Sequence, residues 1–77
     1  MINVLLFAQL QEEAGRDRLE VEMGETTVKE LKQRLQDSFQ LGRLESTMAA
    51  VNEEYARDED TVKPGDTVAF IPPVSGG

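Results

Sequence analysis

Hydrophobic and polar positions recur with different periods along the chain, and each period predicts a type of element. Residues 2–7 are apolar at every position except Asn3, which predicts a strand buried on most of both faces. Residues 18–23 alternate strictly between polar and apolar, which predicts a half-exposed strand that ends at Gly24. Between these strands, residues 8–14 are expected to form one or two helical turns that stop at Gly15.

One long helix is predicted after the second strand. Thr27 and Glu30 have the spacing of a capping box, in which the threonine hydroxyl and the glutamate carboxylate each accept a hydrogen bond from a free backbone N–H group. Apolar residues then recur at helical spacing and predict one buried stripe, formed by Val28, Leu31, Leu35 and Phe39. The polar residues between them are expected to be solvated; they are Lys29, Lys32, Arg34 and Gln36.

The second half of the chain has the pattern of short strands joined by turns. Residues 48–51 predict a third strand, and residues 52–54 predict a turn into a short strand that contains Tyr55. Residues 63–66 predict a tight turn, because proline fixes its own φ and Gly65 accepts a positive φ. Residues 67–71 predict the last strand, which Pro72 and Pro73 must end because neither can donate a hydrogen bond to a neighbouring strand.

The order of these elements predicts an α+β fold of the β-grasp, or ubiquitin-like, type. A single long helix can cover one face of one sheet, so a mixed sheet of four or five strands packed on that helix is the economical arrangement. The first strand should lie inside the sheet, beside the last. A ferredoxin-like fold would need a second long helix, for which residues 41–48 are too short. The predicted domain spans residues 1–71, and residues 72–77 form an extended C-terminal tail.

Composition excludes several classes of function. The 77 residues include no His and no Cys, which excludes thiolate nucleophiles, zinc sites with soft ligands and histidine bases. The formal net charge of −7 argues against nucleic-acid binding. No apolar run is long enough to span a membrane, so we expect a cytoplasmic protein. The acidic run of residues 58–60 does not match a calcium loop, because Lys63 and Ala69 stand where glycine and glutamate are required, and we expect a solvated loop.

The C-terminal residues are the strongest candidate for chemistry. Pro72 and Pro73 give the chain a stiff exit from the sheet, and Val74 and Ser75 extend it. Gly76 and Gly77 have no side chain, so residues 72–77 could thread a narrow channel and reach about 20 Å from the domain. The terminal carboxylate would then be the reactive group, able to attack the α-phosphate of ATP and form an acyl-adenylate that accepts sulfur. The alternative is a frayed terminus that ends in Gly-Gly.

Segments spread over the whole chain resemble one known family. They are residues 4–8, Thr27-Val28 with Leu31, residues 50–52, residues 65–70, and the ending Pro-Pro-Val-Ser-Gly-Gly of residues 72–77. Together they are similar to the small, sulfur-carrying subunit of molybdopterin synthase, the MoaD family. The complete ending is the most specific segment, since ubiquitin and the thiazole-forming ThiS carriers share the Gly-Gly alone. Residues 40–47 look idiosyncratic and carry no functional inference.

The resemblance implies a sulfur carrier that is not an enzyme on its own. It implies that Gly77 is adenylated by an ATP-dependent, MoeB-like activating enzyme and that a sulfur donor protein converts the adenylate to a thiocarboxylate. The tail then enters a MoaE-like large subunit, where the sulfur attacks a cyclic pyranopterin phosphate in molybdenum cofactor biosynthesis. One dithiolene needs two sulfurs, so two carriers act per product, and the resemblance implies a heterotetramer with the large subunit. The carrier itself is expected to bind no cofactor, and ATP is consumed by the activating enzyme.

Strand parity predicts where such a partner would hold the domain. In the last strand, Ile71 lies on the less apolar face together with Thr67 and Ala69. In the first strand, Phe7 lies on the corresponding face together with Asn3 and Leu5. Phe7, Ile71 and Tyr55 form a candidate partner interface, which the tail residues Pro72, Pro73, Val74 and Ser75 continue. In the family, the sheet face near the tail docks onto partners. The alternative is that Phe7 and Ile71 complete the core.

Three other functions stay open at this point. The chain could carry sulfur for thiazole synthesis, or for tRNA thiolation in the manner of the ubiquitin-related modifiers. It could also be a ubiquitin-like interaction domain whose tail is never activated. Detection of a C-terminal thiocarboxylate would separate the carriers from the interaction domain. The sequence identifies neither the sulfur donor nor the activating enzyme.

Overall fold

The computed structural model describes residues 1–39 and 44–71. In chain order the elements are β1 (Ile2–Leu6), α1 (Ala8–Ala14), β2 (Arg18–Val21), β3 (Thr26–Thr27), α2 (Val28–Phe39), the 3-10 turn η1 (Leu44–Ser46), β4 (Met48–Val51), β5 (Glu54–Ala56), β6 (Thr61–Val62) and β7 (Thr67–Ile71). The predicted tail, residues 72–77, lies outside the described residues, as do residues 40–43.

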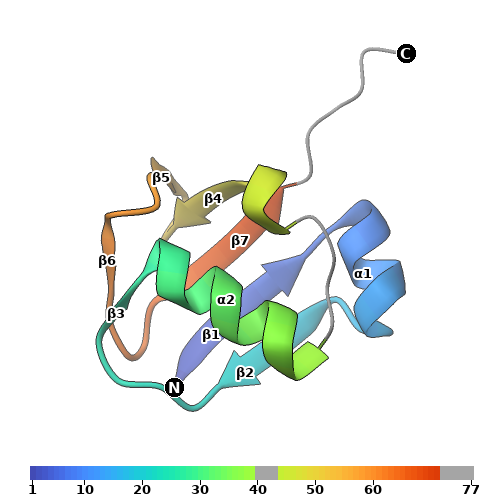
Figure 1. Cartoon of the computed structure of the whole chain (residues 1–77), viewed down its shortest axis with the longest axis horizontal. Helices are drawn as coiled ribbons and strands as arrows, with labels where there is room; N and C mark the ends of the chain where they lie inside the picture. The colour runs from blue at the N-terminus through green and yellow to red at the C-terminus, as the bar shows by residue number, and fades with distance from the viewer. Residues whose placement is uncertain (40–43, 72–77) are drawn as a thin grey trace.

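Five strands form one mixed sheet in the order β2-β1-β7-β4-β5. β1 runs parallel to β7, and the other neighbouring strands are antiparallel. The long helix α2 crosses one face of this sheet (Figure 1). The β-grasp prediction is therefore confirmed, and β1 lies inside the sheet beside β7 as expected. The strands β3 and β6, two residues each, form a separate small pair that the sequence pattern does not predict.

The residues of the central strands alternate between a core face of the sheet, which packs against α2, and an opposite face that α2 does not cover. Every second residue of β1 and β7 is fully buried, and the residues between them are half-buried. The largest buried side chains of the core are Phe70, Ile2, Leu6, Leu19, Leu31, Leu35 and Leu44. Of the predicted helical stripe, Val28, Leu31 and Leu35 join this core, but Phe39 is 37% exposed. Phe39 is the last residue of α2, and its prediction as a core residue is wrong.

The N-terminus of α2 is capped by a different set of groups from the predicted box. The Thr27 hydroxyl accepts a hydrogen bond from the Glu30 N–H at 3.2 Å, as expected, but the Glu30 carboxylate accepts from the Thr26 hydroxyl at 2.8 Å. The N–H groups of Val28 and Lys29 donate to the carbonyl oxygens of residues 60 and 58, both at 3.0 Å. The acidic loop therefore supplies backbone acceptors to the helix N-terminus, where four donors lack partners within the helix.

Lys32 was expected to be solvated, and this prediction is wrong because its side chain is buried. Its ammonium group donates to the carbonyl of Thr47 at 3.3 Å and forms an ion pair with the carboxylate of Asp58 at 3.0 Å. A buried charge is tolerated only when it is paired and hydrogen-bonded, and both conditions hold here. Lys32 thus joins α2 to the segment before β4 and to the acidic loop.

A pair of substitutions tests the role of α2 in the core. Leu31→Ala should lower the free energy of unfolding by about 2–5 kcal/mol, because it opens a cavity at a fully buried position. Thr27→Ala should lower it by about 1 kcal/mol, because it removes the acceptor of one N-terminal hydrogen bond. Urea unfolding of the two variants and the unsubstituted chain measures both values. Equal, small losses would contradict the packing of α2 described above.

Candidate functional site

The predicted tail follows directly from the central strand of the sheet. β7 ends at Ile71, one residue before Pro72, and it has two strands on either side. Gly76 and Gly77, the predicted reactive end, lie outside the described residues, as do Pro72, Pro73, Val74 and Ser75. Their roles stay predictions. The described part of the site is therefore the sheet surface around the end of β7.

The strand register gathers apolar side chains on the open face of the sheet. One row across β1, β7, β4 and β5 contains Leu5, Ala69, Ala50 and Tyr55, which are partners in neighbouring strands. A second row contains Ile71 and Met48. Phe7 follows β1 with extended backbone, φ −127° and ψ 154°, so the alternation of β1 continues and Phe7 lies on the face of Leu5. We use the name open face for these seven residues.

Three large side chains of the open face are accessible to a partner. Tyr55 is 73% exposed, Met48 is 51% exposed and Phe7 is 45% exposed. Ile71 is half-buried. The structure thus places Phe7, Tyr55 and Ile71 outside the buried core and on one sheet face, as strand parity predicted, and the core alternative for Phe7 is wrong. Met48 was missed, although it shares the parity of Ala50 two residues later.

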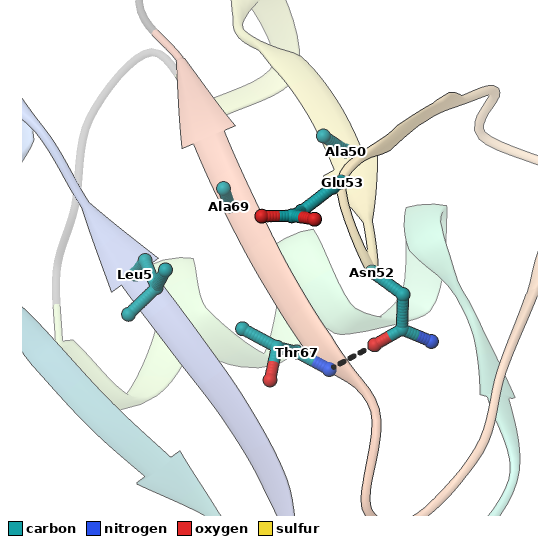
Figure 2. A pocket seen from close by; sticks show the side chains of 6 residues that line it. All are labelled: Leu5, Ala50, Asn52, Glu53, Thr67 and Ala69. Atoms are coloured by element: carbon teal, nitrogen blue, oxygen red, sulfur yellow. Dashed lines mark hydrogen bonds between the residues drawn. The ribbon is translucent and has the colours of Figure 1, made fainter.

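A tight turn between β4 and β5 borders the open face. Asn52 and Glu53 have φ values of 51° and 71°, in the left-handed region that asparagine tolerates better than most residues. The Asn52 N–H donates to the carbonyl of Thr67 at 2.8 Å, and its side-chain oxygen accepts from the Thr67 N–H at 3.0 Å. These two hydrogen bonds fix the turn to the first residue of β7, and Figure 2 shows the one that the Asn52 side chain accepts.

Asp66 extends this connection to the turn before β7. Its carboxylate accepts hydrogen bonds from the Lys63 N–H at 2.9 Å and from the side-chain amide of Asn52 at 3.1 Å. The hydrogen bond from the Lys63 backbone, and then that from Asn52, lower the pKa of Asp66 below its ordinary value of 3.8. Asn52 and Asp66 together therefore hold the β4–β5 turn in place beside the open face.

The lowered pKa of Asp66 predicts a pH dependence of stability. Because the folded state holds the carboxylate in its charged form, the stabilisation is present above the unfolded pKa near 3.8 and is lost as pH falls through the lower folded pKa. Asp66→Asn should therefore be less stable than the unsubstituted chain near neutral pH. The gap, which is the difference between their free energies of unfolding, should shrink below pH 3.8. Urea unfolding across this range measures the gap. A gap that is independent of pH would contradict the assignment.

The acidic loop has a structural role in the described part of the chain. Asp58 pairs with Lys32, and the carboxylate of Asp60 accepts a hydrogen bond from the Arg57 N–H at 2.8 Å.

Among residues 1–39 and 44–71, no group of three metal-binding side chains gathers at one place. Neither helix in these ranges combines the length and the apolar character needed to cross a membrane.

Comparison with known proteins finds one family, curated relatives and solved structures that match almost the whole chain. The ThiS family matches residues 4–77. The molybdopterin synthase sulfur carrier subunit of Escherichia coli (strain K12) is 40% identical over 81 residues, which span 100% of both chains. A putative molybdopterin converting factor, subunit 1, from Pyrococcus furiosus has a TM-score of 0.82 at 26% identity, covering 95% of this chain and 97% of its own. SAMP1 from Haloferax volcanii has a TM-score of 0.80 at 30% identity, covering 99% and 98%.

Proposed function

The chain belongs to the ThiS family, and on that premise we propose that it is the sulfur-carrier subunit of a molybdopterin synthase. The observation that carries the proposal is its 40% identity, over the full length of both chains, to the Escherichia coli sulfur carrier subunit of that enzyme. The fold supports it, because the strand before the predicted reactive tail is the central strand of a sheet with an accessible apolar face. The chain acts as a subunit and not as an enzyme on its own.

The proposed chemistry takes place at the carboxylate of Gly77. In the activating enzyme, a MoeB-like protein, this carboxylate attacks the α-phosphate of ATP, releasing pyrophosphate and forming an acyl-adenylate. Hydrosulfide supplied by a donor protein then displaces AMP and leaves a thiocarboxylate. In the large subunit, the sulfur attacks a side-chain carbon of the cyclic pyranopterin phosphate and replaces the oxygen bound to that carbon. Hydrolysis of the resulting thioester leaves the sulfur on the pterin and restores the carboxylate. Two such cycles supply the two sulfurs of one dithiolene, and we place the pathway in the cytoplasm.

The composition of the chain supports this division of labour. Since the 77 residues include no cysteine and no histidine, the side chain that most often transfers protons in catalysis, we assign proton transfer and pterin binding to the partner. The chain's own contribution is to present the tail and to dock. Phe7, Tyr55 and Ile71 of the open face are the proposed docking residues, and we add Met48 because it is exposed on the same face.

Stepwise reconstitution tests the proposal. The full chain is incubated with a MoeB-like enzyme, ATP and sulfide, and intact mass spectrometry should show one oxygen atom replaced by one sulfur atom. Adding a MoaE-like large subunit and the pterin precursor should then yield the dithiolene product. A thiocarboxylate that forms but supplies only a thiazole synthase would assign the chain to thiazole synthesis. A tail that is never activated would leave a ubiquitin-like interaction domain.

A further inference from the structure

The open face contains a shallow hollow above the middle of the sheet. Its volume is about 380 Å³, at the lower end of the range for pockets that hold a ligand group. Its floor is formed by Leu5, Ala50 and Ala69, and its rim by Asn52, Glu53 and Thr67. The two alanines are partners in neighbouring strands, so two small side chains lie side by side in the lining of the hollow. The hollow is therefore large enough for one partner side chain and is mostly apolar.

Glu53 brings a carboxylate into this apolar hollow. Figure 2 shows its side chain extending from the β4–β5 turn across the sheet toward Ala69 of β7. Its backbone has a positive φ of 71°, a conformation that is uncommon for a glutamate. The hydrogen bonds of Asn52 to Thr67 and Asp66 hold the turn that gives Glu53 this direction. The direction of the carboxylate is thus set by the turn and not by contacts of the carboxylate itself.

No cation of the described residues neutralises this carboxylate. Glu53 takes part in none of the side-chain hydrogen bonds or ion pairs found in residues 1–39 and 44–71. By register a basic residue of this face is Arg18, which is the partner of Leu5 on β2. Arg18 is two strands away from Ala69, roughly 10 Å between backbones. The hollow therefore has a negative group on its rim and apolar walls, which together fit a cation on an aliphatic stem.

We propose that Glu53 receives a basic side chain, lysine or arginine, of the large synthase subunit when the open face docks. This inference rests on the proposed function. The aliphatic stem would lie on Leu5, Ala50 and Ala69 while the charged end meets the carboxylate. Docking removes water from the hollow, so the attraction strengthens and an acidic partner group at this place is rejected. The net charge of −7 also favours the approach of a partner surface that is basic.

Matched glutamine variants test this proposal. Glu53→Gln keeps the shape and removes the charge, and Glu54→Gln makes the same change one residue later. Glu54 is the partner of Val51, whose side chain packs against the core, so Glu54 belongs to the opposite sheet face. Binding of each full-length chain to the purified MoaE-like large subunit is measured by calorimetry. Glu53→Gln should weaken binding by about tenfold to hundredfold, and Glu54→Gln should change it by less than about twofold.

Two further arms identify the charge pair. Raising the salt concentration should weaken binding of the unsubstituted chain more than binding of Glu53→Gln. Glu53→Lys should bind least, and changing the matching lysine or arginine of the large subunit to glutamate should restore its binding. Equal affinities of Glu53→Gln and Glu54→Gln would overturn this inference and leave the proposed function intact. An unsubstituted chain that does not bind the large subunit would overturn both.

Discussion

Deleting Gly77 should abolish product formation by the reconstituted synthase while leaving the domain folded. The new terminal carboxylate would lie about 3.5 Å short of the reaction position. Displacement of a reacting group by about 1 Å already costs on the order of 10²-fold in rate, so the loss should reach at least that size. The docking residues of the open face are untouched, and binding to the large subunit should persist. ATP–pyrophosphate exchange, thiocarboxylate detection and synthase turnover measure the successive steps.

Gly76→Val should give the same loss for a different reason. The number of residues between the domain and the terminal carboxylate is unchanged. However, a β-branched side chain would have to pass through a channel that is wide enough only for glycine. Gly24→Val is the matched control, because an added Cβ at Gly24 meets no atom within 4 Å. This control should retain turnover. Near-normal turnover of the Gly77 deletion or of Gly76→Val would exclude the threaded mechanism and favour a frayed terminus.

The main elements of the fold were predictable because each has a period of its own. Alternation and apolar runs located β1, β2, β4 and β7, and the spacing of Val28, Leu31 and Leu35 located α2. The pair of β3 and β6 was not predictable, since two residues are too few to show a period. Lys32 was misjudged because its burial depends on Thr47 and Asp58, which lie 15 and 26 residues away in sequence. Local polarity indicates solvation, and such distant partners override it.

The candidate site was predictable as far as strand parity applies. Parity placed Phe7, Tyr55 and Ile71 on one face, and the same rule would have added Met48. It could not place the Glu53 side chain, whose direction depends on positive φ angles at residues 52 and 53. Those angles are supported by Asp66 through Asn52, a contact between residues 14 positions apart. A polar pair in a turn shows no periodicity, so the contact between Asn52 and Asp66 and the hollow beside it emerged only from the structure.

Phe7→Ala should weaken binding to the large subunit far more than it weakens the fold. Phe7 is 45% exposed on the open face, so truncation removes an accessible aromatic group and opens no enclosed cavity. An aromatic anchor at the centre of an interface is expected to contribute at least about tenfold in affinity. The expectation for Phe7→Ala is therefore a loss of about tenfold to hundredfold, measured by calorimetry, with a nearly unchanged free energy of unfolding.

Phe70→Ala is the matched control. It also truncates a phenylalanine to alanine, but on the core face of the neighbouring strand β7. Phe70 is fully buried and is the partner of Leu6, the residue before Phe7. Its truncation should lower the free energy of unfolding by about 3–5 kcal/mol through the cavity it leaves. Affinity per folded molecule should change little, since Phe70 does not reach the open face. The opposite result for Phe7→Ala, a large loss of stability with unchanged affinity, would remove Phe7 from the interface and require a docking surface elsewhere on the domain.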